Sequence, residues 1–206
     1  DTYTTEQEEY QWKSHRIFAV DGTKINLPRQ LLSDCYKTPS DNSYYPQALV
    51  SCLYQLKSKI PTDFDLASHK NERRAALTHL NALKQNDIVV YDRGYFSYLM
   101  LHAHHTQHIH AIFRLPAKSH RIIDEFISSQ DIDRIVMIEA SLKIQQKIRK
   151  TNSEIEFILI PLRLIKYVIA GVTYTLGTTL TDSEQYKAEE FPDVYHSRWG
   201  IEELYK

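Results

Sequence analysis

Two aspartates stand at positions where a carboxylate could do chemistry. Asp21 follows the apolar run Ile17–Val20, and Asp92 follows the similar run Ile88–Tyr91. A carboxylate at the end of a buried strand is costly unless something pairs it, and a divalent metal ion is one such partner. If the two strands are neighbours in one sheet, both carboxylates emerge at the same edge. The two aspartates are therefore candidate metal ligands.

A third carboxylate, Glu202, lies in a C-terminal segment that we expect to be helical. Tyr195, Arg198, Trp199 and Glu202 are spaced at i, i+3, i+4 and i+7 and would share one helix face. A guanidinium can hold a phosphate through two hydrogen bonds, and a carboxylate can hold a metal. This face therefore combines a candidate phosphate ligand with a candidate metal ligand.

Each of these features also has a purely structural explanation. An aspartate followed by glycine, as in Asp21-Gly22, is common in turns. An arginine and a glutamate at i, i+4 usually form a solvated surface pair. Ser197 and His196 do not suit nucleophilic catalysis, because adjacent side chains on a helix do not face each other. The acidic residues become persuasive only in combination.

A histidine cluster offers a second metal hypothesis. Its members are His102, His104, His105, His108 and His110. His104 and His108, at i, i+4, could bind zinc, but no cysteine lies near and no acidic residue stands between them. We favour a solvated or weakly DNA-facing helix end.

A basic run could bind nucleic acid. Lys143, Lys147, Arg149 and Lys150 fall within eight residues and could track a DNA backbone. The alternative is an exposed hairpin or helix face.

The elements that must position these residues follow from hydrophobic periodicity. The predicted order is strands at 15–27, 48–56 and 64–67, a helix at 71–83, a buried strand at 88–91, a helix at 96–105 and a strand at 109–115. Asp21 should end the first strand, with Gly22 breaking it. Three apolar segments with alternating charges between them predict further strands at 135–138, 157–164 and 167–175.

The C-terminal part should be helical. Thr181-Asp182-Ser183 should cap a helix beginning near Glu184, and Pro192 should open a last helix at its first turn. The whole order predicts an α/β fold, a mixed sheet of the ribonuclease-H type with flanking helices. A β-rich insertion would precede the C-terminal helix.

Composition is that of an ordinary globular protein. The chain has 206 residues, of which 42% are hydrophobic and 25% charged. A formal net charge of −1 counts against a protein that only coats DNA, since such proteins are normally basic. It does not exclude a nuclease-type site, which adds carboxylates that metal ions neutralise. The sequence has no glycine-rich phosphate loop and no nucleophile elbow, which argues against a small-molecule enzyme.

Several features bear on location. The stretch 157–176 is interrupted by Pro161, Arg163 and Lys166 and is too polar to span a membrane. The polar start, Asp1–Gln11, does not look like a signal peptide. We therefore expect a soluble intracellular protein with two reduced cysteines. Because the chain opens without Met and ends inside a predicted helix, we expect it to be a fragment of a longer protein.

Three blocks resemble those of a known family. The blocks Asp21-Gly22-Thr23, Asp92-Arg93-Gly94-Tyr95 and Tyr195-x-x-Arg198-x-x-x-Glu202 resemble those of the IS4 family of bacterial insertion-sequence transposases. Residues 45–48 and 71–73 are also similar. The resemblance covers residues 16–206, and the last block is its most specific part.

The resemblance implies a DDE transposase that cleaves DNA at insertion-sequence ends and joins it to a target. Asp21, Asp92 and Glu202 would form the catalytic triad that holds two Mg²⁺ (or Mn²⁺) ions. Tyr195, Arg198 and Arg93 would contact DNA phosphate.

The resemblance also implies an organisation and a setting. Residues 1–115 would form the first part of the ribonuclease-H-like core, 116–181 the β-rich insertion, and 182–206 the region of the C-terminal catalytic helix. The partner would be double-stranded DNA, both transposon ends and target, bound by a homodimer in the bacterial cytoplasm at the nucleoid.

Two departures from the family leave alternatives open. The chain stops at Lys206, before the family's conserved lysine seven residues past the glutamate, and neither Trp12 nor Trp199 lies in the insertion, where some relatives stack a flipped base. The chain could therefore be a truncated, inactive DNA-binding remnant. It could also be a metal-dependent DNA nuclease on the same fold.

Overall fold

The computed structural model describes residues 11–68 and 71–205 of the chain. Most of the polar N-terminal stretch and Lys206 lie outside the described residues. The chain forms two compact units, one made of residues 1–89 and 197–206 and the other of residues 90–196. Asp21 and Glu202 belong to the first unit, and Asp92 belongs to the second.

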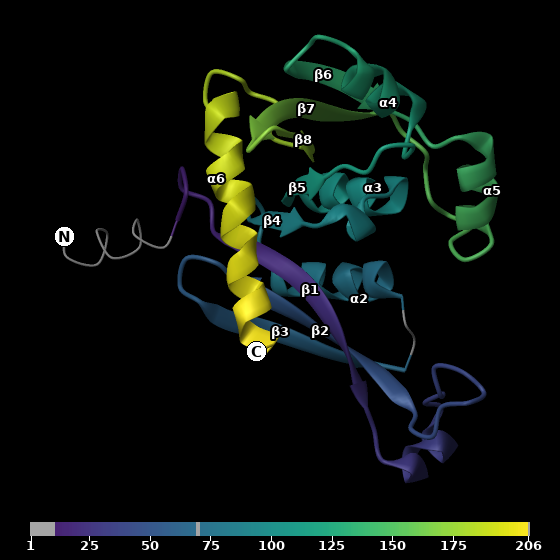
Figure 1. Cartoon of the computed structure of the whole chain (residues 1–206). Coiled ribbons are helices and arrows are strands. Elements are labelled where there is room, and N and C mark those ends of the chain that lie inside the picture. Colours follow the sequence, from purple (N-terminus) through teal and green to yellow (C-terminus); the bar gives the residue numbers. More distant parts are fainter. Residues whose placement is uncertain (1–10, 69–70, 206) are drawn as a thin grey trace. The chain divides into compact units, whose positions relative to one another are not determined.

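The first unit contains an antiparallel meander of three strands. These are β1 (Ile17–Asn26), β2 (Gln47–Gln55) and β3 (Ile60–Ala67), with β2 in the middle (Figure 1). A short 3-10 helix, η1 (Arg29–Asp34), lies in the loop between β1 and β2. The predicted meander is confirmed. β3 begins earlier than expected because an edge strand tolerates Pro61.

Asp21 lies in the middle of β1, and the prediction that it ends the strand is wrong. The ladder with β2 continues through the pairs Asp21–Cys52 and Gly22–Ser51 as far as Asn26. What changes at Asp21 is burial, because Ile17–Val20 are buried whereas the rest of the strand is half-buried or exposed. The buried part of the strand therefore ends at Val20, directly before Asp21.

Helix α2 (Glu72–His79) packs on the meander and continues as the 3-10 helix η2 (Leu80–Ala82). It begins where Asn71 caps it, accepting a hydrogen bond from the Arg74 N–H at 3.2 Å. The buried ring of His79 bonds to Asp63 at 2.7 Å and to Ser51 at 3.0 Å, which ties the helix to β3 and β2. Ser51 is fully buried, so this Ser–His–Asp arrangement cannot meet a substrate.

Strand β4 (Ile88–Tyr91) starts in the first unit and ends in the second. All four residues are buried, as the continuous apolar run predicts. The strand starts beside β1, where the Ile88 N–H donates to the Arg16 carbonyl at 2.9 Å. A bidentate pair of Arg16 with Asp87 closes this end. Asp92 follows the strand directly and precedes the 3-10 helix η3 (Arg93–Tyr95).

The second unit has four antiparallel strands in the order β5-β8-β7-β6. Their bounds are β5 (His110–Arg114), β6 (Asp133–Ile138), β7 (Ile160–Ile169) and β8 (Val172–Thr178). β8, which was expected in the insertion, pairs directly with the core strand β5 through Ile112–Thr178 and its neighbours. The boundaries proposed from the family resemblance, at 115/116 and 181/182, stay predictions.

Three helices accompany this sheet, and two of them were missed. α3 (Tyr98–Gln107) is the predicted helix, and it begins at the cap Ser97. α4 (Arg121–Ser128) and α5 (Leu142–Arg149) lie in a region predicted as mainly strand. α4 buries Ile123 and Phe126, at helical spacing, but its eight residues are too few for the helical period to be clear from sequence.

The C-terminal segment is helical later than predicted. Asp182 accepts hydrogen bonds from the Glu184 and Gln185 N–H groups, but residues 183–185 form a turn, so the expected helix near Glu184 is wrong. An Asx turn satisfies the same donors without starting a helix. After the 3-10 helix η4 (Ala188–Glu190), α6 (Phe191–His196) starts with Pro192 in its first turn, as predicted. It continues as the 3-10 helix η5 (Ser197–Tyr205).

The apolar stretch 157–176 forms strands. It covers β7 and the start of β8, joined by a turn at Ala170 and Gly171. Among the described residues, no helix has the length and apolar character needed to cross a membrane.

Candidate active site

Asp21 is a carboxylate held where its charge is unfavourable. Burial raises its pKa above the ordinary value of 3.8, and the nearby carboxylates Glu202 and Glu72 raise it further. The Gly22 N–H, which donates to Asp21 Oδ1 at 2.9 Å, and the guanidinium of Arg198 act in the opposite direction. The anion is thus only partly compensated by the protein.

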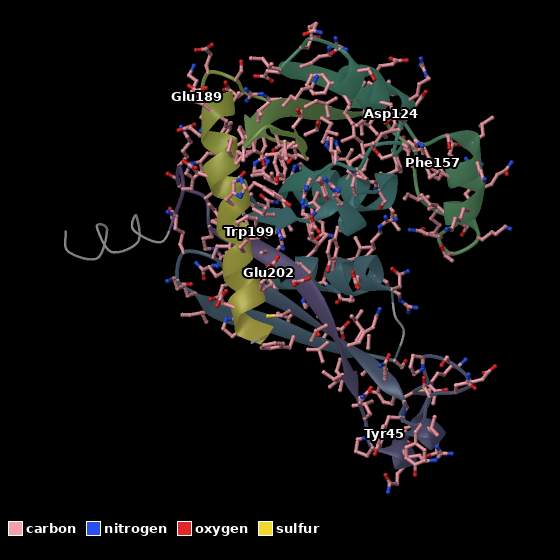
Figure 2. All side chains as sticks on the ribbon, in the orientation of Figure 1. Tyr45, Asp124, Phe157, Glu189, Trp199 and Glu202 are labelled. Carbon is pink, nitrogen blue, oxygen red and sulfur yellow. The ribbon has the colours of Figure 1, made fainter. Side chains whose placement is uncertain are left out.

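Arg198 and Glu202 form an ion pair on η5, which packs against β1. Arg198 Nη2 donates to Glu202 Oε1 at 2.8 Å, as the i, i+4 spacing predicts. The arginine side chain is only 7% exposed and the glutamate side chain 48%, so this is not the solvated pair of the alternative reading. Figure 2 shows Glu202 on this last helical segment, where Trp199 is also labelled. Trp199 is more than half exposed, unlike the buried Arg198.

Glu72 is a carboxylate near the site that the sequence reasoning did not assign. It opens α2, and its Cγ would lie 3.5 Å from a Cβ added at Gly22. A side chain at position 22 would also meet Leu49 at 3.0 Å. The glycine therefore lets α2 approach β1 closely. The block 71–73 had been noted as similar to the family, but nothing in its residue types indicated a place beside Asp21.

In the second unit, Asp92 is flanked by a tyrosine and an arginine. The buried Tyr195 donates its hydroxyl to Asp92 Oδ1 at 3.2 Å. Arg114 Nη1, from β5, lies 3.8 Å from the same oxygen. Asp92 remains about half exposed, so it is accessible to a ligand. Sequence reasoning found Tyr195 but missed Arg114, because the position of β5 beside β4 in the sheet, and not local spacing, places it here.

The Arg114 guanidinium is part of a stack of rings. It lies 4.9 Å from the centre of the Tyr174 ring, which stacks on Tyr167 at 5.3 Å and an interplanar angle of 13°. Burial raises the pKa of Tyr167, so its hydroxyl stays neutral. Arg114 Nε is buried and has no hydrogen-bond partner among the described residues. The arginine is thus held rigidly with one donor unused.

Arg93 and the basic run differ from these buried groups. Arg93 is exposed in η3, next to Asp92. Lys143, Lys147, Arg149 and Lys150 are all exposed on or just after α5, which is a helix and not a hairpin.

The histidine cluster is not a zinc site. His104 is fully buried, with one ring nitrogen bonded to the Tyr91 hydroxyl at 3.0 Å and the other to the Ile109 carbonyl at 3.1 Å. Burial lowers its pKa to about 4, so it is neutral and fully engaged. The expected solvated helix end is therefore wrong for His104, although His108 is exposed at the C-cap.

The acidic residues have the chemistry of a magnesium site. Carboxylate oxygens are the ligands that Mg²⁺ prefers, and a divalent cation would relieve the repulsion that Asp21 receives from Glu202. Within either unit alone, the described residues contain no group of three potential metal ligands.

Comparison with known protein families identifies the family of this chain. Residues 12–206 match the family described as "Transposase DDE domain". The chain belongs to this DDE transposase family. The resemblance to IS4-family transposases found in the sequence is also confirmed, because the chain is 24% identical over 200 residues to "Transposase InsG for insertion sequence element IS4" of Escherichia coli (strain K12).

The DDE transposase fold extends to distant structures. The chain is similar to the structure titled "Cryo-EM structure of piggyBac transposase synaptic complex with hairpin DNA", with a TM-score of 0.52 and 11% identity over 92% of this chain. The predicted ribonuclease-H-like α/β fold is confirmed. The match with InsG includes 95% of this chain but only 44% of InsG. The match with the piggyBac structure includes 39% of that chain.

Proposed function

We propose that the protein cleaves DNA at the ends of an insertion sequence and transfers the freed strand to target DNA. The observation that carries the proposal is the cluster of Asp21, Glu202 and the buried Arg198, in a chain of the DDE transposase family. A metal-binding carboxylate and a phosphate-binding guanidinium side by side suit a phosphodiester substrate.

Asp21, Asp92 and Glu202 would hold two Mg²⁺ or Mn²⁺ ions. When bound, the metal ions would supply a nucleophile at neutral pH and stabilise the leaving oxygen. Three carboxylates are needed because two divalent cations beside one phosphodiester require compensating anions.

The remaining residues would bind and orient. Arg198 would offset negative charge on the scissile phosphate, since its buried guanidinium is already oriented by Glu202. Tyr195 would fix the orientation of Asp92 through its hydrogen bond. Arg114, whose side chain is partly exposed, and the exposed Arg93 would contact neighbouring phosphates.

The partner we propose is double-stranded DNA, both element ends and target. InsG is named for an insertion sequence element, and the piggyBac structure is titled as a synaptic complex with hairpin DNA. Two element ends must be brought together before transfer, which favours a homodimer on DNA at the bacterial nucleoid.

Replacing Asp92 by Asn tests the proposal. The amide keeps the shape of the carboxyl and can still accept from Tyr195, so the fold should survive while cleavage of a supercoiled plasmid in Mg²⁺ falls roughly 1000-fold or more. The control is Asp41→Asn, in an exposed loop. Undiminished cleavage by the Asp92 variant would end the assignment. Cut product without joined product would favour a nuclease, and no metal-dependent cleavage by the wild type would favour an inactive remnant.

A further inference from the structure

Helix α5 carries a stripe of cations. Lys143, Lys147 and Lys150 are spaced at i, i+4 and i+7 along α5 and the residue that caps it, so they share one face. Gln146 lies on the same face, and all four side chains are exposed. The stripe extends roughly 10 Å along the helix axis. One DNA strand carries a charge about every 3.4 Å of axis, so the stripe matches about three phosphates.

The charge of this stripe is not compensated. Residues 141–153 contain four cations and no Asp or Glu. Elsewhere in the same unit, three exposed cations have carboxylate partners, in the pairs Arg121–Glu125, Arg134–Asp131 and Lys187–Glu184. Within the described part of the chain, none of the three lysines forms an ion pair. In a chain of net charge −1, such a concentration marks a surface for an anionic partner.

The helix is held so that the stripe stays outside. Ser141 caps α5, and Ile148 is its buried residue. The Arg149 guanidinium lies 5.3 Å from the centre of the Phe157 ring, which is labelled in Figure 2. Arg149, included in the basic run, therefore anchors the helix, whereas the lysines are left to solvent. In Figure 1, α5 stands apart from β6, β7 and β8.

We propose that α5 binds the phosphate backbone of duplex DNA through Lys143, Lys147 and Lys150, independently of base sequence. The inference rests on the proposed function for its choice of DNA as partner. The exposed lysines offer point charges to phosphates, and release of counterions drives the binding.

The test measures binding of an unrelated duplex by fluorescence anisotropy in EDTA, where cleavage plays no part. Three glutamines in place of the lysines keep helix propensity. Each lost contact should lower the slope of log K against log salt by about 0.9. Between 50 and 200 mM salt, the wild type should therefore lose about 40-fold more affinity than the triple variant.

A charge-matched control separates contact from net charge. It replaces three paired cations, Arg121, Arg134 and Lys187, by glutamine and should keep the wild-type slope. A variant with arginine at all three lysine positions should keep it too. An unchanged slope in the lysine variant, or an equal drop in the control, would overturn the proposal. If cleavage fails in Mg²⁺ but the slope behaves as stated, the proposed function fails while α5 remains a DNA-binding helix.

Discussion

At the scale of single residues, the site places the carboxylate of Asp21, whose pKa is raised, near the buried guanidinium of Arg198. Asp21 is disfavoured as a carboxylate by burial and by two neighbouring carboxylates, and Arg198 compensates it only in part. Unfavourable charge of this kind is common at functional sites, because the ligand supplies what the protein lacks. The cost to the folded state should be measurable without any substrate.

Replacing Asp21 by Asn should stabilise the metal-free protein at neutral pH. The raised pKa means that the folded state binds a proton more tightly than the unfolded state, so stability falls as pH rises from about 4 through the raised pKa. The neutral Asn does not lose stability in this way. The variant should therefore have a higher Tm than the wild type at pH 7, and the same Tm below pH 3.8, where the wild-type carboxyl is protonated. Thermal unfolding in EDTA at both pH values measures this difference.

Asp182→Asn is the control of opposite sign. Hydrogen bonds from the Gln185 and Glu184 N–H groups lower the pKa of Asp182, so its stabilising effect is present at pH 7 and lost in acid. This variant should lower the Tm at pH 7. An Asp21 variant that loses stability equally at both pH values would show that burial of its charge costs nothing.

At the scale of elements, register and close approach place the side chains. The sequence predicted β1, β2 and β4 because continuous apolar runs bounded by polar or turn residues favour strands, and it predicted the spacing of Arg198 and Glu202 because helices have a fixed period. It could not predict Glu72 or Arg114 at the site. Glu72 depends on how closely α2 approaches β1 at Gly22, and Arg114 depends on the position of β5 beside β4 in the sheet.

Gly177→Ala tests close approach in the second unit. A Cβ at this position in β8 would lie 2.9 Å from Leu115 and 3.1 Å from Leu162, in the buried layer between β5 and β7. Overpacking of this kind should cost about 1–3 kcal/mol in urea unfolding. Gly94→Ala, whose Cβ would meet nothing within 4 Å, should change stability by less than about 0.5 kcal/mol. Equal effects would mean that β8 is packed less tightly than described.

At the scale of the whole molecule, the predicted triad is divided between two units. Asp21 and Glu202 come from one and Asp92 from the other. Sequence blocks were sufficient to predict the family, because Tyr195, Arg198 and Glu202 form a specific pattern. They could not predict this division, since contacts between distant segments define the units. The net charge of −1 likewise did not indicate a DNA-binding surface. It sums over the whole chain, where many cations are paired with carboxylates, and so does not reveal the local stripe of unpaired lysines on α5.

The most direct test of the central claim is the anomalous diffraction of a crystal of this protein soaked with Mn²⁺. The proposed function predicts manganese bonded to carboxylate oxygens of Asp21, Asp92 and Glu202 together, and loss of that signal in the Asp92→Asn variant. Manganese bound elsewhere, or a crystal in which Glu202 lies well over 10 Å from Asp92 with and without metal, would contradict it.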